Sequence, residues 1–178
     1  MSTPQPIALR KAGEAPDSAN LVREENGNRF VAGHAEPEAL LAHPVMLQVT
    51  GISPTQRAEM LETIRQGLRF GAVEQLELAL RASRKEMAAV LSIPISTLTR
   101  RKNEGSLRSD ESDRVVRVAH LADAAIAMMH GDQNAALNWL RTPLDILGNE
   151  TPLMRASTEL GARDVEDLIG RLRHGVFS

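Results

Sequence analysis

The residues best suited to chemistry form a short basic segment, residues 81–108, near the middle of the chain. It holds seven lysine and arginine residues against two glutamates, a net charge of +5, between residues 1–80 at -3 and residues 109–178 at -4. A concentration of positive charge on one face is typical of proteins that bind polyanions such as DNA. A solvated helix face with no ligand is the alternative interpretation.

The pattern inside the basic segment predicts two short helices joined by a turn. Ser83 followed by Glu86 has the spacing of a capping box, which predicts a helix over residues 84–91. Ser92-Ile93-Pro94 predicts a turn, because the residue before a proline disfavours helical geometry. A second helix is expected from Ile95 or Ser96 to about Asn103. This order is the outline of a helix-turn-helix.

The second helix carries hydroxyl and arginine side chains near its beginning, and these groups suit base-edge and phosphate contacts. Leu98 is expected to face the core, while the polar side chains from Ser96 to Lys102 are expected to point outward. The predicted DNA-binding residues are Arg84, Lys85, Ser96, Thr97, Thr99, Arg100, Arg101 and Lys102. An ordinary helical hairpin with a basic outer face remains the alternative.

Apolar periodicity predicts further helices that must position this segment. They lie at about residues 54–66, 72–81, 109–130, 133–140, 152–160 and 162–173, with Ser53 as the first N-cap, Gly161 as the end of the fifth helix and Gly175 as the last C-cap. Residues 1–50 contain five prolines and no sustained period, which indicates an arm. Its apolar run Val45–Val49 is expected either to dock on the main body or a partner, or to stay disordered with the arm.

Composition narrows the class of protein. Aromatic residues make up 2% of the chain and cysteine is absent, which favours an all-α fold and excludes disulfides and common zinc sites. The five histidines lack metal-ligand spacing, and no phosphate loop or nucleophile motif occurs. We therefore expect no enzyme, cofactor or metal site. No apolar run could span a membrane and no signal peptide is evident, so the expected location is the cytoplasm.

A set of motifs over residues 60–178 resembles a known family. The motifs are Ser96–Lys102, Gly105-x-Leu107, Glu111-Ser112-Asp113-Arg114, Gly131-Asp132, Asn138-Trp139-Leu140, Thr151-Pro152-Leu153 and Arg173-His174-Gly175-Val176. Together they resemble the Xre-like antitoxins of RES–Xre toxin–antitoxin pairs, including the MbcA/ParS/Xre toxin-binding domain. Two positions depart from the pattern: His130 precedes Gly-Asp where an aromatic residue is common, and Asn149 stands where a second glycine is usual.

The resemblance implies a helix-turn-helix DNA-binding region over residues 51–115 and a helical toxin-binding domain over residues 116–178, after the arm at residues 1–50. Such a protein binds the operator of its own operon as a homodimer or higher assembly. It also neutralises a RES-domain toxin that consumes NAD+, by covering the toxin's active site. The implied toxin-binding residues are Trp139, Arg171, Arg173, His174, Gly175, Val176 and Phe177. The alternative is a helix-turn-helix transcriptional regulator whose C-terminal domain only oligomerises.

Overall fold

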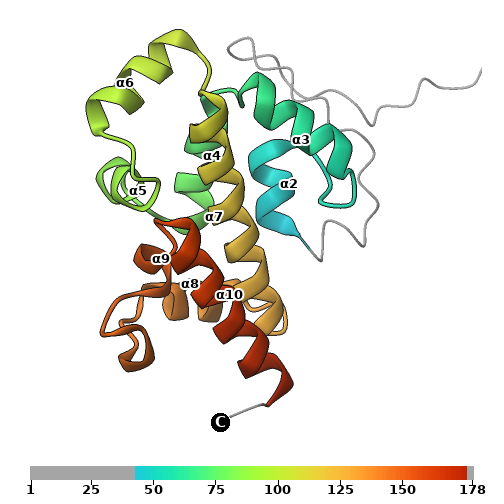
Figure 1. Cartoon of the computed structure of the whole chain (residues 1–178), viewed down its shortest axis with the longest axis vertical. Helices are drawn as coiled ribbons and strands as arrows, with labels where there is room; N and C mark the ends of the chain where they lie inside the picture. The colour runs from blue at the N-terminus through green and yellow to red at the C-terminus, as the bar shows by residue number, and fades with distance from the viewer. Residues whose placement is uncertain (1–42, 176–178) are drawn as a thin grey trace, which may run out of the picture. The chain divides into compact units, whose positions relative to one another are not determined.

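The computed structural model describes residues 43–175, and all regular structure within them is helical (Figure 1). The predicted all-α fold is therefore confirmed. The helices are α2 (Pro44–Thr50), α3 (Arg57–Gln66), α4 (Gly71–Leu80), α5 (Arg84–Val90), α6 (Ile95–Glu104), α7 (Ser109–Met128), α8 (Gln133–Arg141), the 3-10 helix η1 (Asp145–Leu147), α9 (Pro152–Arg155) and α10 (Glu159–His174).

The long helix α7 organises the described part of the chain. It contacts α2, α3, α4, α8 and α10, and it runs from the region of α4–α6 to that of α8–α10 (Figure 1). Val115, Ala119 and Ala125 on α7 are completely buried, as the predicted apolar stripe requires. One hydrophobic core extends from Val45 to Ile169. The expected domain boundary between residues 115 and 116 therefore lies within α7. This helix packs against helices that precede the boundary and against helices that follow it.

Helix α2 lies within the segment predicted as an arm and packs on the main body. Val45, Met46 and Val49 are buried, and the helix contacts α4 and α7. The backbone amides of Val45 and Met46 donate to the carboxylate of Asp123 on α7, at 2.8 and 3.0 Å. Burial raises the pKa of Asp123, while these two hydrogen bonds act in the opposite direction. Of the two alternatives for Val45–Val49, the structure therefore shows docking on the main body. Residues 1–42 of the predicted arm lie outside the described residues.

The predicted start of the first long helix, at Pro54 with Ser53 as its N-cap, is wrong by three residues. Ser53 begins a turn in which the Gln56 amide donates to the Ser53 carbonyl at 2.9 Å. The Ser53 hydroxyl lies 2.8 Å from that of Thr55, so it does not cap the helix. Helix α3 begins at Arg57.

The prediction that Gly161 ends a helix is also wrong. Helix α9 ends at Arg155, and Gly161 lies in the first turn of α10, where its amide donates to the Thr158 hydroxyl at 3.1 Å. A Cβ atom at residue 161 would lie 2.0 Å from the carbonyl oxygen of Arg155. The glycine is therefore explained by the close approach of α9 to α10, which a pattern along the chain does not reveal.

Candidate functional site

The predicted helix-turn-helix forms around a fully buried apolar centre. Ser83 and Glu86 make the expected capping box, and α5 and α6 flank the turn at residues 91–94. Met87, Leu91 and Leu98 have no exposed surface. Because these side chains hold α5 and α6 together, α6 presents a fixed face to solvent.

The exposed face of α6 carries most of the polar side chains predicted to bind DNA. Ser96, Thr99, Arg100 and Lys102 are exposed, and Thr97 is half-buried. The Thr99 hydroxyl donates to the Ile95 carbonyl of its own helix at 3.0 Å. This face thus combines hydroxyls with cationic groups, which are the side chains that contact base edges and phosphates in a major groove.

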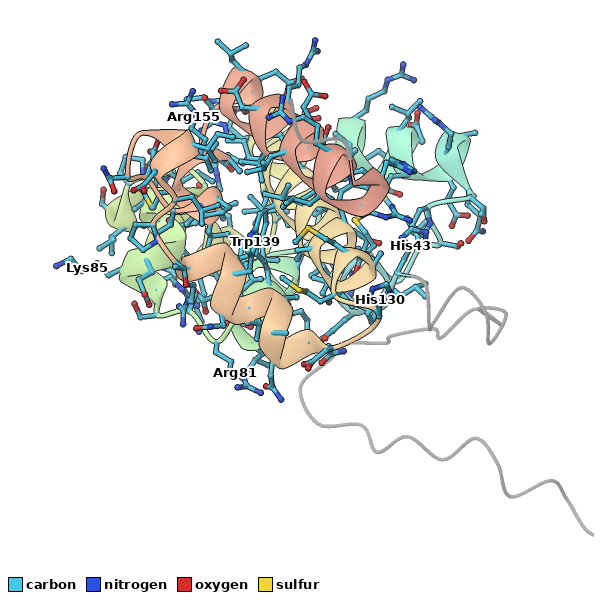
Figure 2. All side chains as sticks on the ribbon, turned by 90° about the horizontal axis from the view of Figure 1, so that it is seen from below. His43, Arg81, Lys85, His130, Trp139 and Arg155 are labelled. Carbon is cyan, nitrogen blue, oxygen red and sulfur yellow. The ribbon has the colours of Figure 1, made fainter. Side chains whose placement is uncertain are left out.

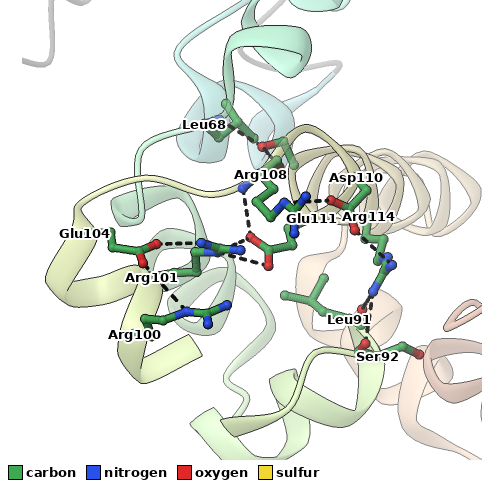
Figure 3. A network of polar contacts seen from close by, with 11 residues as sticks. Leu68, Leu91, Ser92, Arg100, Arg101, Glu104, Arg108, Asp110, Glu111 and Arg114 are labelled. Carbon is green, nitrogen blue, oxygen red and sulfur yellow. Dashed lines mark hydrogen bonds and ion pairs between the residues drawn. The ribbon is translucent and has the colours of Figure 1, made fainter. Parts of the chain in front are cut away.

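Arg101 is a correction to the expectation that all the basic side chains of α6 point outward. Its side chain is about 10% exposed and donates to Glu111 of α7 at 2.7 Å and to Glu104 at 2.5 Å (Figure 3). These hydrogen bonds raise the pKa of the Arg101 guanidinium, and the bond to Glu111 contributes more than the bond to Glu104. The Glu111 carboxylate also accepts from the Arg108 amide at 2.8 Å. Arg101 therefore joins α6 to the beginning of α7.

Arg84 and Lys102 are also held by carboxylates of the same chain. Arg84 forms a two-pronged ion pair with Glu77 of α4, and its guanidinium lies 5.0 Å from the centre of the Phe70 ring. Lys102 lies 2.9 Å from Glu74, which is also 3.8 Å from Arg84. Hydrogen bonding to Glu77 raises the pKa of Arg84. The glutamates of α4 thus compensate part of the positive charge on the helix-turn-helix.

Among the predicted DNA-binding cations, Lys85 and Arg100 are held least by carboxylates of the chain. Lys85 is exposed, points away from the helices in Figure 2 and has no ion-pair partner among residues 43–175. Arg100 is 60% exposed and lies 3.7 Å from Glu104, a solvated pair of the kind that contributes little energy. Neither side chain needs to leave a buried position to reach a phosphate.

Arg114 of α7 holds the turn of the helix-turn-helix in place. Its guanidinium donates to the carbonyls of Leu91 and Ser92, at 3.4 and 2.9 Å, and to Asp110 at 3.2 Å (Figure 3). Ser92 has a positive φ of 51°, and its hydroxyl donates to the Ser157 carbonyl at 3.3 Å. The turn is therefore bonded to α7 and to the segment before α10.

Sequence reasoning missed the partners that orient the basic side chains, namely Glu74, Glu77 and Glu111. Glu111 offered one available signal, because it stands three residues after Arg108 at the start of a helix, the capping-box position. Glu74 and Glu77 offered none, since their partners lie on other helices.

The C-terminal end of α10 forms a second cationic surface. Arg171, Arg173, His174 and the αL cap residue Gly175 are exposed. The three cationic or ionisable side chains have no ion-pair partner within the described range 43–175. Leu172, between the two arginines, is 36% exposed. The predicted toxin-binding residues Val176 and Phe177 lie outside the described residues.

Trp139, the cap of α8 and an ion pair of α9 belong to the same C-terminal part of the chain. Trp139 on α8 is half-buried and packs against the hydrophobic core (Figure 2). Asp132 caps α8 by accepting from the Ala135 amide at 3.0 Å, as its position after Gly131 predicts. Arg155 of α9 donates to Asp164 of α10 at 2.5 Å, and this bond raises the pKa of Arg155. The Arg155–Asp164 pair therefore joins α9 to α10.

Two classes of site are not found in the described part of the chain. No group of three or more His, Cys, Asp or Glu side chains is placed to hold a metal ion within residues 43–175. In the same range, no helix combines the length and apolar character needed to cross a membrane. The arrangement is that of two cationic surfaces on one helical core.

Comparisons with known proteins agree with this arrangement. A model of the antitoxin Xre-like helix-turn-helix domain matches residues 59–120, and a model of the antitoxin Xre/MbcA/ParS C-terminal toxin-binding domain matches residues 124–175. The chain is 34% identical to Antitoxin Xre of Yersinia enterocolitica over 129 residues, which cover 72% of this chain and 87% of the relative. It is 32% identical over 116 residues to Antitoxin Xre of Photorhabdus laumondii, with 65% and 78% covered.

A third relative, Antitoxin Xre of Pseudomonas putida, is 33% identical over 84 residues, 47% of this chain and 52% of that protein. The matched domains include both cationic surfaces, since α6 lies in the first match and the end of α10 in the second. The chain belongs to the Xre family of antitoxins, with a helix-turn-helix domain followed by a C-terminal toxin-binding domain.

Proposed function

We propose that this protein neutralises a RES-domain toxin that consumes NAD+ and represses its own operon by binding operator DNA. The observation that carries the proposal is the exposed cationic end of α10, which lies within the match to a toxin-binding domain and has no ion-pair partner within residues 43–175. Repression of an operon would place the protein in the cytoplasm.

The toxin-binding surface is proposed to comprise the end of α10 and the residues that follow it. Arginine side chains match the phosphate groups of a nucleotide-binding site in charge and geometry. Arg171, Arg173 and His174 would therefore face the site where the toxin holds its substrate. Trp139, whose ring packs on the core, would serve as a packing anchor of the toxin-binding domain.

The DNA-binding surface is proposed to be the exposed face of α6 with the start of α5. Ser96, Thr97 and Thr99 would contact base edges, while Lys85, Arg100 and Lys102 would contact phosphates. Arg84 and Arg101 are proposed as positioning residues because their guanidinium groups are held by glutamates. A homodimer would place two copies of α6 in successive major grooves, one helical turn apart.

Cellular NAD+ provides the direct test of the toxin-binding function. The protein encoded by the neighbouring gene is expressed with and without this chain, and NAD+ is measured over time. We expect depletion without the chain and restoration with it. A neighbouring protein that leaves NAD+ unchanged, or depletion that persists when both are expressed, would contradict the proposal.

A deletion of residues 174–178 separates the two surfaces. We expect the shortened chain to lose neutralisation and to keep its affinity for the DNA upstream of its own gene, because α6 is untouched. Full neutralisation by the shortened chain would show that the end of α10 does not cover the toxin.

The second candidate is a transcriptional regulator whose C-terminal domain only forms oligomers, favoured by the well-formed helix-turn-helix. Co-expression with the neighbouring protein distinguishes the two. A stoichiometric complex on size exclusion supports the antitoxin function, whereas a homo-oligomer that never retains the neighbour supports the regulator.

A further inference from the structure

The most unusual exposed side chain on the proposed DNA-binding surface is apolar. Ile95, the first residue of α6, is 48% exposed although it stands beside the hydroxyl and cationic groups of that face. Leu98, one turn later, is completely buried. The chain thus places one aliphatic side chain in the core and leaves another in solvent within a single helical turn.

The position of Ile95 follows from the start of the helix. Pro94 is the N-cap, with an extended ψ of 143°, so the chain enters α6 sharply at Ile95. Residues four apart lie one above the other on a helix, which puts Ile95 in line with the exposed Thr99. Ile95 is therefore part of the outward face, at the end of α6 that a recognition helix turns toward the bases.

We infer that Ile95 reads a thymine by contacting its 5-methyl group in the major groove. The thymine methyl is the apolar group that a base pair presents there, and aliphatic side chains contact it. Neighbouring Ser96 and Thr99 supply hydroxyls for the adjacent base edges, so the surface has both apolar and hydrogen-bonding readers. The inference rests on the proposed operator binding and adds a specificity-determining residue to it.

Replacing thymine by uracil removes only this methyl group and therefore isolates the contact. The segment protected by the wild-type chain is first located by footprinting on the DNA upstream of its own gene. Duplexes are then made with deoxyuridine in place of one thymidine at a time, or of one symmetric pair at a time. Their affinities for the wild type, Ile95→Ala and Ile95→Val are measured at constant salt.

We expect one thymine position, or one symmetric pair, at which uracil weakens wild-type binding by about three- to fivefold per methyl, the size expected for one buried methyl group. Ile95→Ala should bind the unmodified duplex more weakly by a similar factor and show no further loss with uracil. Ile95→Val keeps a branched side chain and should retain most of the preference. Leu78→Ala, which changes another exposed aliphatic residue, on α4, should leave both affinities unchanged.

Several results would overturn the inference. One is a uracil effect that is equally large in Ile95→Ala, and another is wild-type binding that no uracil substitution weakens. A third is an affinity of Ile95→Ala that is lower than that of the wild type by the same factor on every duplex. That result would indicate that the side chain is covered by a second copy of the chain instead. If the wild type protects no DNA segment at all, the proposed operator binding fails and this inference fails with it.

Discussion

The exposed face of α6 and the end of α10 are both positively charged, but the protein treats the two sets of charges differently. On and around α6, Arg84, Arg101 and Lys102 each contact a glutamate of the chain at 2.9 Å or less. At the end of α10, Arg171 and Arg173 have no such partner within residues 43–175.

The difference indicates two ways of using cationic side chains. Ion pairs with the chain's own carboxylates fix the direction of a side chain, and they also lower the charge available to a ligand. Unpaired cations on a helix end keep their full charge for a partner but are not oriented in advance. We therefore expect the α6 surface to depend on its glutamates, whereas the α10 surface should respond directly to changes in its arginines.

The largest effect is expected from Arg101→Ala. It leaves the Glu111 carboxylate, only 5% exposed, without its cation, and removal of one partner from a buried ion pair is strongly destabilising. We expect the melting temperature to fall by on the order of 10 °C. Thermal unfolding followed by circular dichroism measures it. Arg100→Ala, one residue away and exposed, is the matched control and should melt like the wild type.

The next largest effect is expected from Arg171→Ala combined with Arg173→Ala. Losing two unpaired cations at a partner surface should raise the antitoxin dose needed for half-neutralisation by about tenfold or more. Titration against the NAD+ consumption of the proposed RES-domain toxin measures this dose. Arg163→Ala, an exposed arginine earlier on α10, serves as the control. Equal loss in the control would show that general charge, not the end of the helix, attracts the toxin.

A smaller effect, of opposite sign, is expected from Glu74→Gln. The change releases Lys102 from its 2.9 Å ion pair and Arg84 from its 3.8 Å contact, so more positive charge is available to DNA. We expect operator affinity to rise by about threefold at low salt, with the gain shrinking as salt screens the charges. Glu62→Gln, which releases Arg65 on α3, is the control. Unchanged affinity would mean that the pairs do not compete with phosphates.

The smallest effect is expected from Arg100→Ala, measured as the dependence of operator affinity on salt. Loss of one phosphate contact per bound subunit should reduce the slope of log affinity against log salt by about 0.9 for each subunit on the DNA. Folded Arg100→Ala/Arg101→Ala protein should show the same slope as the single variant, because Arg101 is held by Glu111. A reduction twice as large in the double variant, about 1.8 for each bound subunit, would instead place both arginines on phosphates.

Local patterns predicted much of the fold. The capping box at Ser83 and Glu86, the start of α8 at Gln133 and the end of α6 close to Asn103 all form as expected. Each depends on hydrogen bonds between residues no more than four apart, so the residues that decide them are visible together in the sequence. The failures at Ser53 and Gly161 arose where a plausible cap residue was used for a turn or a close approach.

The candidate surfaces were predicted less completely than the helices. The family motifs indicated both domains, and the hydroxyl-rich face of α6 is exposed as expected. The direction of Arg101 was wrong because periodicity assigns a long basic side chain to solvent unless a buried partner is known. The exposure of Ile95 was also not predicted. Here the bias runs the other way, because an aliphatic residue at the start of a helix suggests a place in the core.

By itself, the sequence determined the helical class, the helix-turn-helix, the division of charge and the family. These depend on composition, on apolar period and on residues that are neighbours along the chain. Tertiary structure decided which cations are available and whether residues 44–50 join the core. Those outcomes depend on partners such as Glu111 for Arg101 and Asp123 for the amides of α2. These partners lie far apart in the sequence and meet only when α7 packs against the other helices. Once buried, a carboxylate is costly unless it accepts hydrogen bonds or is paired with a cation.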